Sequence, residues 1–307
     1  MHVWQPFADL EQRTGPAPPG LEVTVWDGTG DLPADRDEVQ ALVMPYLDGA
    51  GAVEVLTSLP RLRWLQTLTA GTDSLRGKVP TGVRVANARG LHDTATSELA
   101  LTLALDGRNL MREFDDDRAA GVWGSHGQRP GLADARVLLV GYGSIGKAIA
   151  ARLAPFECEL TVLASHARTE DGVAVHGFEE LSELAAGADV VVLVVPLTDR
   201  TRGMVDADVL ARLPDGAVVV NVGRGALVDT DALVAELSTG RLRAGLDVTD
   251  PEPLPAGHPL WSVPGLVLTP HVGGHARAFD PRARDFVAGV LRRLADGDQP
   301  LNLVERL

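Results

Sequence analysis

Residues 136–164 read RVLLVGYGSIGKAIAARLAPFECELTVLA and carry the strongest structural signal in the chain. An apolar run, RVLLV, leads into three glycines spaced as G-x-G-x-x-G, at Gly141, Gly143 and Gly146, and a helical pattern then precedes a second apolar run. In this setting the first glycine permits a tight turn, the second lets the backbone approach a pyrophosphate, and the third lets helix and strand pack closely. The N-terminus of the following helix attracts negative charge. The stretch therefore predicts a strand–turn–helix–strand unit that binds a dinucleotide.

Further apolar runs follow at 188–196, 216–223, 243–248 and 265–271. These runs are apolar throughout instead of alternating, which is typical of parallel strands covered by helices on both faces. Amphipathic helical patterns lie between them at 206–213 and 229–240, and the second ends in a glycine suited to a helix C-terminus. The middle of the chain is therefore predicted to be a doubly wound parallel-sheet nucleotide-binding domain.

The first hundred residues alternate short apolar runs with loops, which predicts a second α/β domain with strands within 21–27, 41–46, 62–73 and 83–90. Helices are expected from about 96 to 117 and from about 277 to 296. A chain of 307 residues is long for one core and suits two domains. We expect an α/β fold of two Rossmann-like domains. In it a nucleotide-binding domain (99–274) is inserted into a smaller flavodoxin-like substrate domain (1–98 and 275–307).

The composition limits the kinds of partner. A net charge of -14 disfavours nucleic acid or an anionic membrane as the main partner, although a local arginine could still bind a small anion. The single cysteine, Cys158, cannot form an intramolecular disulfide, which suits a reducing compartment. The start shows no basic region followed by an apolar run, and no apolar stretch reaches transmembrane length. We expect a cytoplasmic protein, and we predict no metal site.

The residue about 20 positions beyond the glycine motif usually decides the form of the dinucleotide, because an acid there holds the ribose hydroxyls of NAD. Here the second strand is followed by Ser165, His166 and Arg168, with no carboxylate at that place. A hydroxyl and a guanidinium suit the additional phosphate of NADP. The sequence favours NADP over NAD, with a solvated Arg168 and NAD as the alternative.

Three polar residues follow predicted strands and match the needs of 2-oxo acid reduction. This reaction needs a cation for the carboxylate and carbonyl, a proton donor for the developing alkoxide, and a group that orients the donor. Arg224 lies between two glycines in NVGRGALVD, Glu252 between two prolines in LDVTDPEPLP, and His271 closes LVLTPHVGG. Each follows the C-terminal end of a predicted parallel strand, where open α/β sheets bind ligands. His275 is the rival proton donor, and each residue taken alone also fits a surface loop.

The chain resembles the D-isomer-specific 2-hydroxyacid dehydrogenases over nearly its whole length, most strongly from Val137 to Gly274. The stretches that carry the likeness are VLLVGYGSIGKAIA, ADVVVLVVPLTDRTRGMVD, LPDGAVVVNVGRGALVDTDALVAEL, LRAGLDVTDPEPLPAGHPLW and LTPHVGG. The resemblance implies an NAD(P)-dependent enzyme that interconverts small 2-oxo acids and D-2-hydroxy acids. It also implies a homodimer that pairs through the nucleotide-binding domains.

The resemblance also implies the roles of individual residues. The catalytic residues are Arg224, Glu252 and His271. The backbone amides at Gly71 and Thr72 hold the substrate carboxylate together with Arg224 and His271. The cofactor-binding residues, which include an aspartate beside the nicotinamide carboxamide (Asp247) and the P-L-T-x-x-T segment, are Gly141, Gly143, Ser144, Ile145, Gly146, Ser165, His166, Arg168, Pro196, Thr201, Val222, Asp247 and Gly273.

The acyl chain of the substrate is left open by the sequence. Glyoxylate and hydroxypyruvate are the first expectation, because small polar 2-oxo acids are common among relatives that prefer NADP. One alternative is a relative that oxidises another small anion, such as formate or phosphite. A second is a cofactor-sensing interaction protein on the same fold, similar to the corepressor branch, since fold alone does not decide function.

Overall fold

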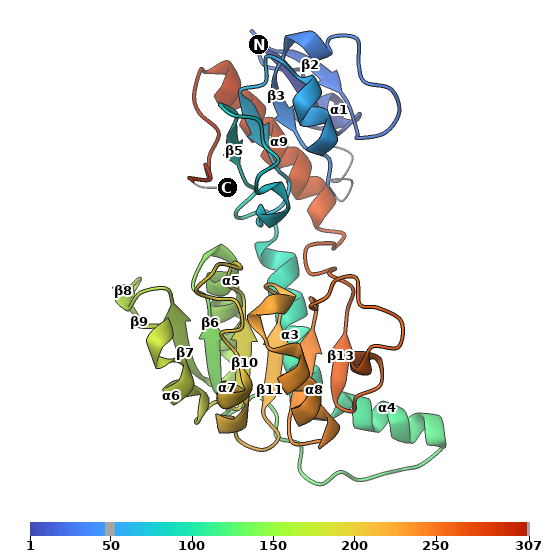
Figure 1. Cartoon of the computed structure of the whole chain (residues 1–307), viewed down its shortest axis with the longest axis vertical. Helices are drawn as coiled ribbons and strands as arrows, with labels where there is room; N and C mark the ends of the chain where they lie inside the picture. The colour runs from blue at the N-terminus through green and yellow to red at the C-terminus, as the bar shows by residue number, and fades with distance from the viewer. Residues whose placement is uncertain (47–52, 306–307) are drawn as a thin grey trace. The chain divides into compact units, whose positions relative to one another are not determined.

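The computed structural model describes residues 1–46 and 53–305. The chain divides into two compact units. A flanking unit comprises Met1–His92 and Arg277–Leu307, and a central unit comprises Asp93–Ala276. The central unit is thus inserted into the flanking one, and both contain a parallel sheet with helices (Figure 1). The expected two-part α/β fold is confirmed.

The sheet of the central unit has the strand order β13-β12-β11-β10-β6-β7-β9-β8. Every neighbouring pair is parallel except β8 and β9, which are antiparallel at the edge. The order reverses between β6 and β10, and ligands bind at such a switch point in doubly wound sheets. The strands are β6 (Arg136–Val140), β7 (Glu159–Ala164), β8 (Arg168–Glu170), β9 (Val173–Gly177), β10 (Val190–Leu193), β11 (Val218–Asn221), β12 (Arg243–Leu246) and β13 (Leu266–Leu268).

Both faces of this sheet are buried, which explains the unbroken apolar runs. In β6, Val137 and Leu139 pack in one cluster with α3 and α5, whereas Leu138 and Val140 pack in another with α6, α7 and α8. Successive strand side chains point to opposite faces, so a strand covered on both sides must be apolar at every position. The helices are α3 (Asp93–Asn109), α4 (Met111–Ala120), α5 (Ser144–Leu153), α6 (Leu181–Ala185), α7 (Ala207–Arg212) and α8 (Thr230–Ser238). Short 3₁₀ turns are η4 (Ala154–Phe156), η5 (Phe178–Glu180), η6 (Gly225–Leu227) and η7 (Pro259–Trp261).

The flanking unit has a parallel sheet with the order β2-β1-β3-β4-β5. This is the flavodoxin-like order, as expected. Its strands are β1 (His2–Gln5), β2 (Glu22–Val25), β3 (Val39–Val43), β4 (Trp64–Gln66) and β5 (Arg84–Ala86). Its helices are α1 (Leu10–Thr14) and α9 (Phe279–Ala295), and its 3₁₀ turns are η1 (Arg36–Glu38), η2 (Leu56–Ser58) and η3 (Asp73–Leu75).

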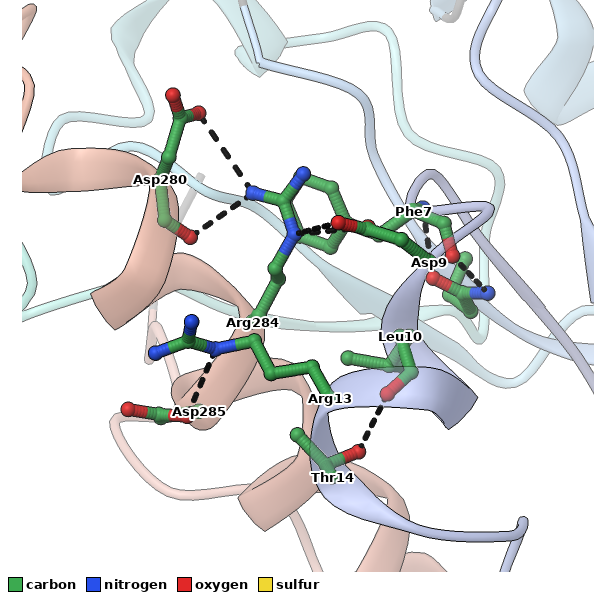
Figure 2. A network of polar contacts seen from close by, with 9 residues as sticks. Phe7, Asp9, Leu10, Arg13, Thr14, Asp280, Arg284 and Asp285 are labelled. Atoms are coloured by element: carbon green, nitrogen blue, oxygen red, sulfur yellow. Dashed lines mark hydrogen bonds and ion pairs between the residues drawn. The ribbon is translucent and has the colours of Figure 1, made fainter.

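Helix α9 returns the chain to the flanking unit. Its apolar stripe, with Phe279, Val287 and Leu291, is buried in one cluster with β1 and β3. Figure 2 shows the polar contacts beside it, where Arg284 donates through Nε to Asp9 at 2.8 Å. The hydrogen bond from Arg284 lowers the pKa of Asp9. Sequence-distant ends of the chain are thereby held together.

Several elements differ from the sequence-based expectation. Strand β1 and the β8–β9 hairpin were not predicted. The helix expected from 96 to 117 is two helices, because Leu110 takes a left-handed conformation (φ 57°) that ends α3 and precedes α4. Helix α3 begins at Asp93 and packs on α5, so the central unit begins before the predicted residue 99. It also extends to Ala276, past the predicted end at 274.

Candidate active site

His271 and Glu252 form a hydrogen-bonded pair in the central unit. The imidazole Nδ1 lies 2.5 Å from Glu252 Oε1. His271 follows β13, and Glu252 lies in the loop after β12, so neighbouring strands deliver the two side chains to the same sheet edge. A carboxylate on Nδ1 fixes the tautomer and leaves Nε2 as the nitrogen that can exchange a proton with a ligand. The two residues predicted to work together are therefore in contact.

Asp247 holds the turn that presents His271. Its side chain is only 2% exposed. Oδ1 accepts hydrogen bonds from Thr269 Oγ1 (2.6 Å) and the amide of Val272 (2.8 Å), and Oδ2 accepts from the amide of Gly273 (2.8 Å). The backbone of His271 itself has a left-handed φ of 55°. The described contacts of the Asp247 carboxylate thus serve the turn, and its expected contact with a nicotinamide carboxamide stays a prediction.

Arg224 lies on a second braced turn, after β11. The side chain of Asn221 is almost fully buried, donates to the carbonyl oxygen of Arg224 at 2.8 Å, and accepts from the amide of Gly223 at 3.0 Å. The two glycines beside Arg224 allow close packing within the protein, because a Cβ at Gly225 would lie 2.0 Å from the backbone of Thr249 and one at Gly223 would lie 3.0 Å from the oxygen of Val195.

The glycine motif forms the predicted turn between β6 and α5. Gly141 has a φ of 120°, and a Cβ there would lie 2.7 Å from the oxygen of Val194. A Cβ at Gly146 would lie 2.0 Å from the oxygen of Gly141, so the third glycine permits the close packing of helix on strand. A Cβ at Gly143 would meet no protein atom within 4 Å. The second glycine therefore keeps an open space at the start of α5, which fits a pyrophosphate against the helix N-terminus.

Two neighbours of the motif also bear on this cradle. Ile145 is half-buried and packs against the α3–α5 side of the core. Ser144 donates a short hydrogen bond to Asp93 at the start of α3. Asp93 was not predicted as a site residue, and no motif marks it, since the contact depends on how α3 packs on α5.

The loop after β10 closes on itself. Thr201 is buried, donates to the oxygen of Pro196 at 2.7 Å, and accepts from the amide of Thr198 at 2.8 Å. The hydroxyl of Thr201 therefore shapes the loop, and its expected contact with a cofactor is left as a prediction. Val222 is likewise buried, and Gly273 is required because a Cβ there would lie 2.8 Å from an oxygen of Asp247.

The three residues selected for cofactor preference lie after β7. Ser165 and His166 are exposed, and His166 Nδ1 lies 3.0 Å from Ser165 Oγ. Arg168 opens β8, and its guanidinium binds Glu170 two residues further on. The guanidinium expected to bind the additional phosphate of NADP thus already has a carboxylate partner.

The loop predicted to hold a carboxylate belongs to the flanking unit and follows β4. Thr69 Oγ1 donates to the oxygen of Gly71 at 2.7 Å, and Asn87 Nδ2 donates to the oxygen of Ala70 at 2.9 Å. Thr72 immediately precedes the 3₁₀ turn η3. The loop is thus held in part through the carbonyl oxygens of Ala70 and Gly71.

A cavity of about 470 Å³ opens beside the His271–Glu252 pair in the central unit. Its apolar lining includes Leu254, Trp261 and Leu268. This volume lies in the range of small-molecule sites. Across residues 1–46 and 53–305, no group of three or more His, Cys, Asp or Glu side chains could hold a metal ion. Within the same residues, no helix has both the length and the apolar character needed to cross a membrane.

Comparison with known proteins decides the family. Residues 101–273 match the model of the NAD-binding domain of D-isomer specific 2-hydroxyacid dehydrogenases. The chain belongs to this family.

Relatives and solved structures agree with this assignment. The glyoxylate reductase/hydroxypyruvate reductase of Homo sapiens is 32% identical over 276 residues, which are 82% of this chain and 81% of the human protein. The glyoxylate reductase of Thermococcus gammatolerans is 29% identical over 310 residues, covering 93% of this chain and 90% of that protein. A dehydrogenase of the family from Xanthobacter autotrophicus Py2, solved with NADPH and MES, is 30% identical with a TM-score of 0.81. It covers 99% of this chain and 97% of its own.

The protein is therefore an NAD(P)-dependent 2-hydroxyacid dehydrogenase, and its glycine motif lies inside the matched region. The predicted family, enzyme class and cofactor type are confirmed. The roles of individual site residues, the substrate and the choice between the two nicotinamide cofactors remain proposals.

Proposed function

We propose that this dehydrogenase uses NADPH to reduce small 2-oxo acids to D-2-hydroxy acids, with glyoxylate and hydroxypyruvate as its first substrates. The observation that carries the proposal is the 2.5 Å contact between His271 and Glu252. A proton donor oriented by a carboxylate is what carbonyl reduction needs, because the oxygen gains negative charge as the carbon is reduced. The glyoxylate reductases among the relatives support the choice of substrate.

Each catalytic side chain has one role in this proposal. The glycine cradle at Gly141–Gly146 would hold the pyrophosphate of the cofactor, whose nicotinamide ring would supply the hydride. Arg224 binds the substrate carboxylate and polarises the carbonyl through its planar fork. His271 donates its Nε2 proton to the carbonyl oxygen, and Glu252 holds the imidazole and stabilises its charged form before transfer. In the reverse direction His271 accepts the proton from the hydroxyl group.

The preference for NADPH rests on the end of β7. Ser165 stands where NAD-specific domains usually place an acid, and Arg168 is close enough in sequence to reach a phosphate. The solved relative that contains NADPH supports this choice.

A substrate panel tests the proposed reaction. Glyoxylate, hydroxypyruvate, pyruvate and longer 2-oxo acids are each offered with NADPH and with NADH, and loss of reduced-nicotinamide absorbance is followed. We expect turnover with the smallest acids and a higher kcat/KM with NADPH. Oxidation of formate or phosphite, without reduction of any 2-oxo acid, would contradict the proposal. Cofactor binding with no turnover of any of these substrates would favour the cofactor-sensing alternative.

His271→Ala tests the proton donor. We expect kcat to fall by about 10²–10⁴-fold, since this is the usual contribution of a positioned acid. Binding of NADPH, measured by fluorescence, should change little. His275→Ala is the matched variant, because His275 is the nearest other imidazole in the chain. A fall in the kcat of His275→Ala, together with wild-type kcat in His271→Ala, would assign the proton donor to His275 instead.

We also propose a cytoplasmic homodimer that pairs through the central unit. Every residue of α4 is at least partly exposed, and the loop after it exposes Val122 (54%) and Trp123 (103%). Neighbouring exposed apolar side chains can form part of a protein interface. Light scattering should give a dimer for the wild type and a smaller mass for Trp123→Ser; a wild-type monomer would contradict the proposal.

A further inference from the structure

The hairpin that follows the cofactor-binding strand β7 carries an unexpected charge cluster. Strands β8 and β9 pair antiparallel at the sheet edge, with Arg168 opposite Val175 and Glu170 opposite Val173. Arg168 and Glu170 are two residues apart on one strand, so their side chains lie on the same face. The cluster formed there consists of these two residues with Lys147 and Asp171.

Glu170 is the centre of the cluster. Arg168 directs two nitrogens at one of its oxygens, Nε at 2.8 Å and Nη2 at 2.5 Å from Oε2. Lys147, from helix α5 of the glycine motif, binds the other oxygen, with Nζ 2.6 Å from Oε1. The pKa of Glu170 is lowered first by its hydrogen bond with Lys147 and then by that with Arg168. The carboxylate is therefore ionised at neutral pH.

The charges of the cluster cancel. Arg168 and Lys147 are positive, and Glu170 and Asp171 are negative, with Lys147 Nζ also 2.9 Å from Asp171. A third Arg168 nitrogen, Nη1, donates to the oxygen of His166 at 3.2 Å. The guanidinium that a 2′-phosphate would need is thus already bound to a carboxylate on one side and to backbone on the other.

The Arg168–Glu170 pair is also accessible to solvent. The side chains are 38% and 31% exposed. Water and salt weaken such a pair, whereas a phosphate carries more charge than a carboxylate and offers several acceptor oxygens to the guanidinium fork. A phosphate can therefore take the place of Glu170, while Lys147 remains to hold the displaced carboxylate.

We propose that Glu170 is a specificity-determining residue of the cofactor site: it competes with the 2′-phosphate of NADP for Arg168 and so limits the preference for NADP over NAD. The proposal rests on the proposed use of NADPH. It predicts that removal of the negative charge at Glu170 strengthens binding of 2′-phosphorylated nucleotides and leaves binding of unphosphorylated ones unchanged.

Isothermal titration of the full chain with 2′,5′-ADP and 5′-AMP tests this directly, because the two probes differ in the 2′-phosphate and lack the nicotinamide. Glu170→Gln should tighten binding of 2′,5′-ADP about fivefold, which corresponds to the upper strength of an exposed ion pair, and should leave binding of 5′-AMP unchanged. Likewise, NADPH should bind Glu170→Gln more tightly than it binds the wild type, and binding of NADH should be unchanged. Added NaCl should reduce the difference.

Asp171→Asn is the matched control. It removes one negative charge from the same cluster but leaves the Arg168–Glu170 contact in place. We expect its affinity for 2′,5′-ADP to change less than threefold, since an exposed charge without direct contact contributes little. An equal gain in both variants would show a general field effect and would overturn the competition.

Arg168→Ala separates this inference from the proposed NADPH use. Weaker 2′,5′-ADP binding in Arg168→Ala, with no gain in Glu170→Gln, would overturn the role of Glu170 and leave the NADPH proposal intact. Weaker binding in Glu170→Gln would also overturn it, since Glu170 would then position the guanidinium. Unchanged binding in Arg168→Ala would overturn both. A fluorescence melting curve for each variant confirms that it is folded before titration.

Discussion

Asp247→Asn should destabilise the central unit although it changes neither the size nor the shape of a buried side chain. The carboxylate accepts hydrogen bonds from Thr269 Oγ1 and from the amides of Val272 and Gly273. All three partners are donors. An asparagine supplies one acceptor oxygen and one NH₂ group, so in either orientation a donor faces a donor. At least one buried N–H or O–H group then loses its partner.

The magnitude follows from those contacts. A hydrogen bond to a charged group contributes about 1.5–3 kcal/mol, and a buried donor left without a partner costs about 1–3 kcal/mol. We therefore expect a loss of about 3 kcal/mol in the free energy of unfolding of the central unit. For a domain of this size that corresponds to a fall in Tm of about 6–12 °C. Turnover should fall as well, because the released turn carries His271.

Unfolding measured by circular dichroism is the deciding assay, since the expected nicotinamide contact of Asp247 would lower activity by a separate route. Asp215→Asn is the matched control, because its side chain is 88% exposed and its unfolding should stay within about 0.5 kcal/mol of the wild type. Asp247→Asn unfolding at the wild-type temperature would refute the reasoning that these hydrogen bonds hold the turn.

Three further predictions concern other parts of the chain. Gly146→Ala should weaken NADPH binding more than about tenfold, because its Cβ would lie 2.0 Å from a backbone oxygen. Gly289→Ala, in α9, is the matched control: a Cβ there meets no protein atom within 4 Å beyond the backbone of its own helix, so Tm should rise slightly and NADPH binding should not change. Equal effects of the two substitutions on Tm and on NADPH binding would contradict this prediction. The hydrogen bond from Arg241 lowers the pKa of Glu236 below its usual value of 4.5, so the stability from this pair is present above that pH and is lost as the pH falls through the lowered pKa. As the pH is decreased, the Tm of Glu236→Gln should therefore fall less steeply than that of the wild type. Parallel dependences of Tm on pH would disprove this prediction. Burial raises the pKa of the Cys158 thiol, so iodoacetamide labelling followed by mass spectrometry should be slower than for free cysteine at pH 8, and equal rates would contradict it.

The sheet of the central unit could be predicted from sequence because its strands are buried on both faces and are apolar at every position. The β8–β9 hairpin could not, since its residues, such as Arg168 and Glu170, are polar and exposed at an edge. Strand β1 is short and includes His2 and Gln5, which hide its place as an interior strand of the sheet. The break at Leu110 could not be predicted, because leucine favours helix, whereas Leu110 has a left-handed backbone in the structure.

The site residues also divide into those that the sequence could predict and those that it could not. Arg224, Glu252 and His271 could be selected because each follows a strand, and parallel strands end at one edge. The residues that brace them could not be selected: Asn221 and Thr269 act through turns whose shape depends on neighbouring loops. The close packing of the glycines beside Arg224 could not be predicted for a similar reason, since the atoms they approach, in Val195 and Thr249, belong to other loops.

The return of α9 to the flanking unit has a consequence for biosynthesis. The core of that unit includes Val3 and Ala41 from the start of the chain and Val287 and Leu291 from α9. A nascent chain leaving the ribosome has all of Asp93–Ala276 before it has α9. The central unit can therefore fold during translation, while the first ninety or so residues lack part of their core until synthesis is nearly finished. A ribosome-bound chain in which Asp93–Ala276 has left the exit tunnel and α9 has not should show a protease-resistant central unit and a protease-sensitive N-terminal segment.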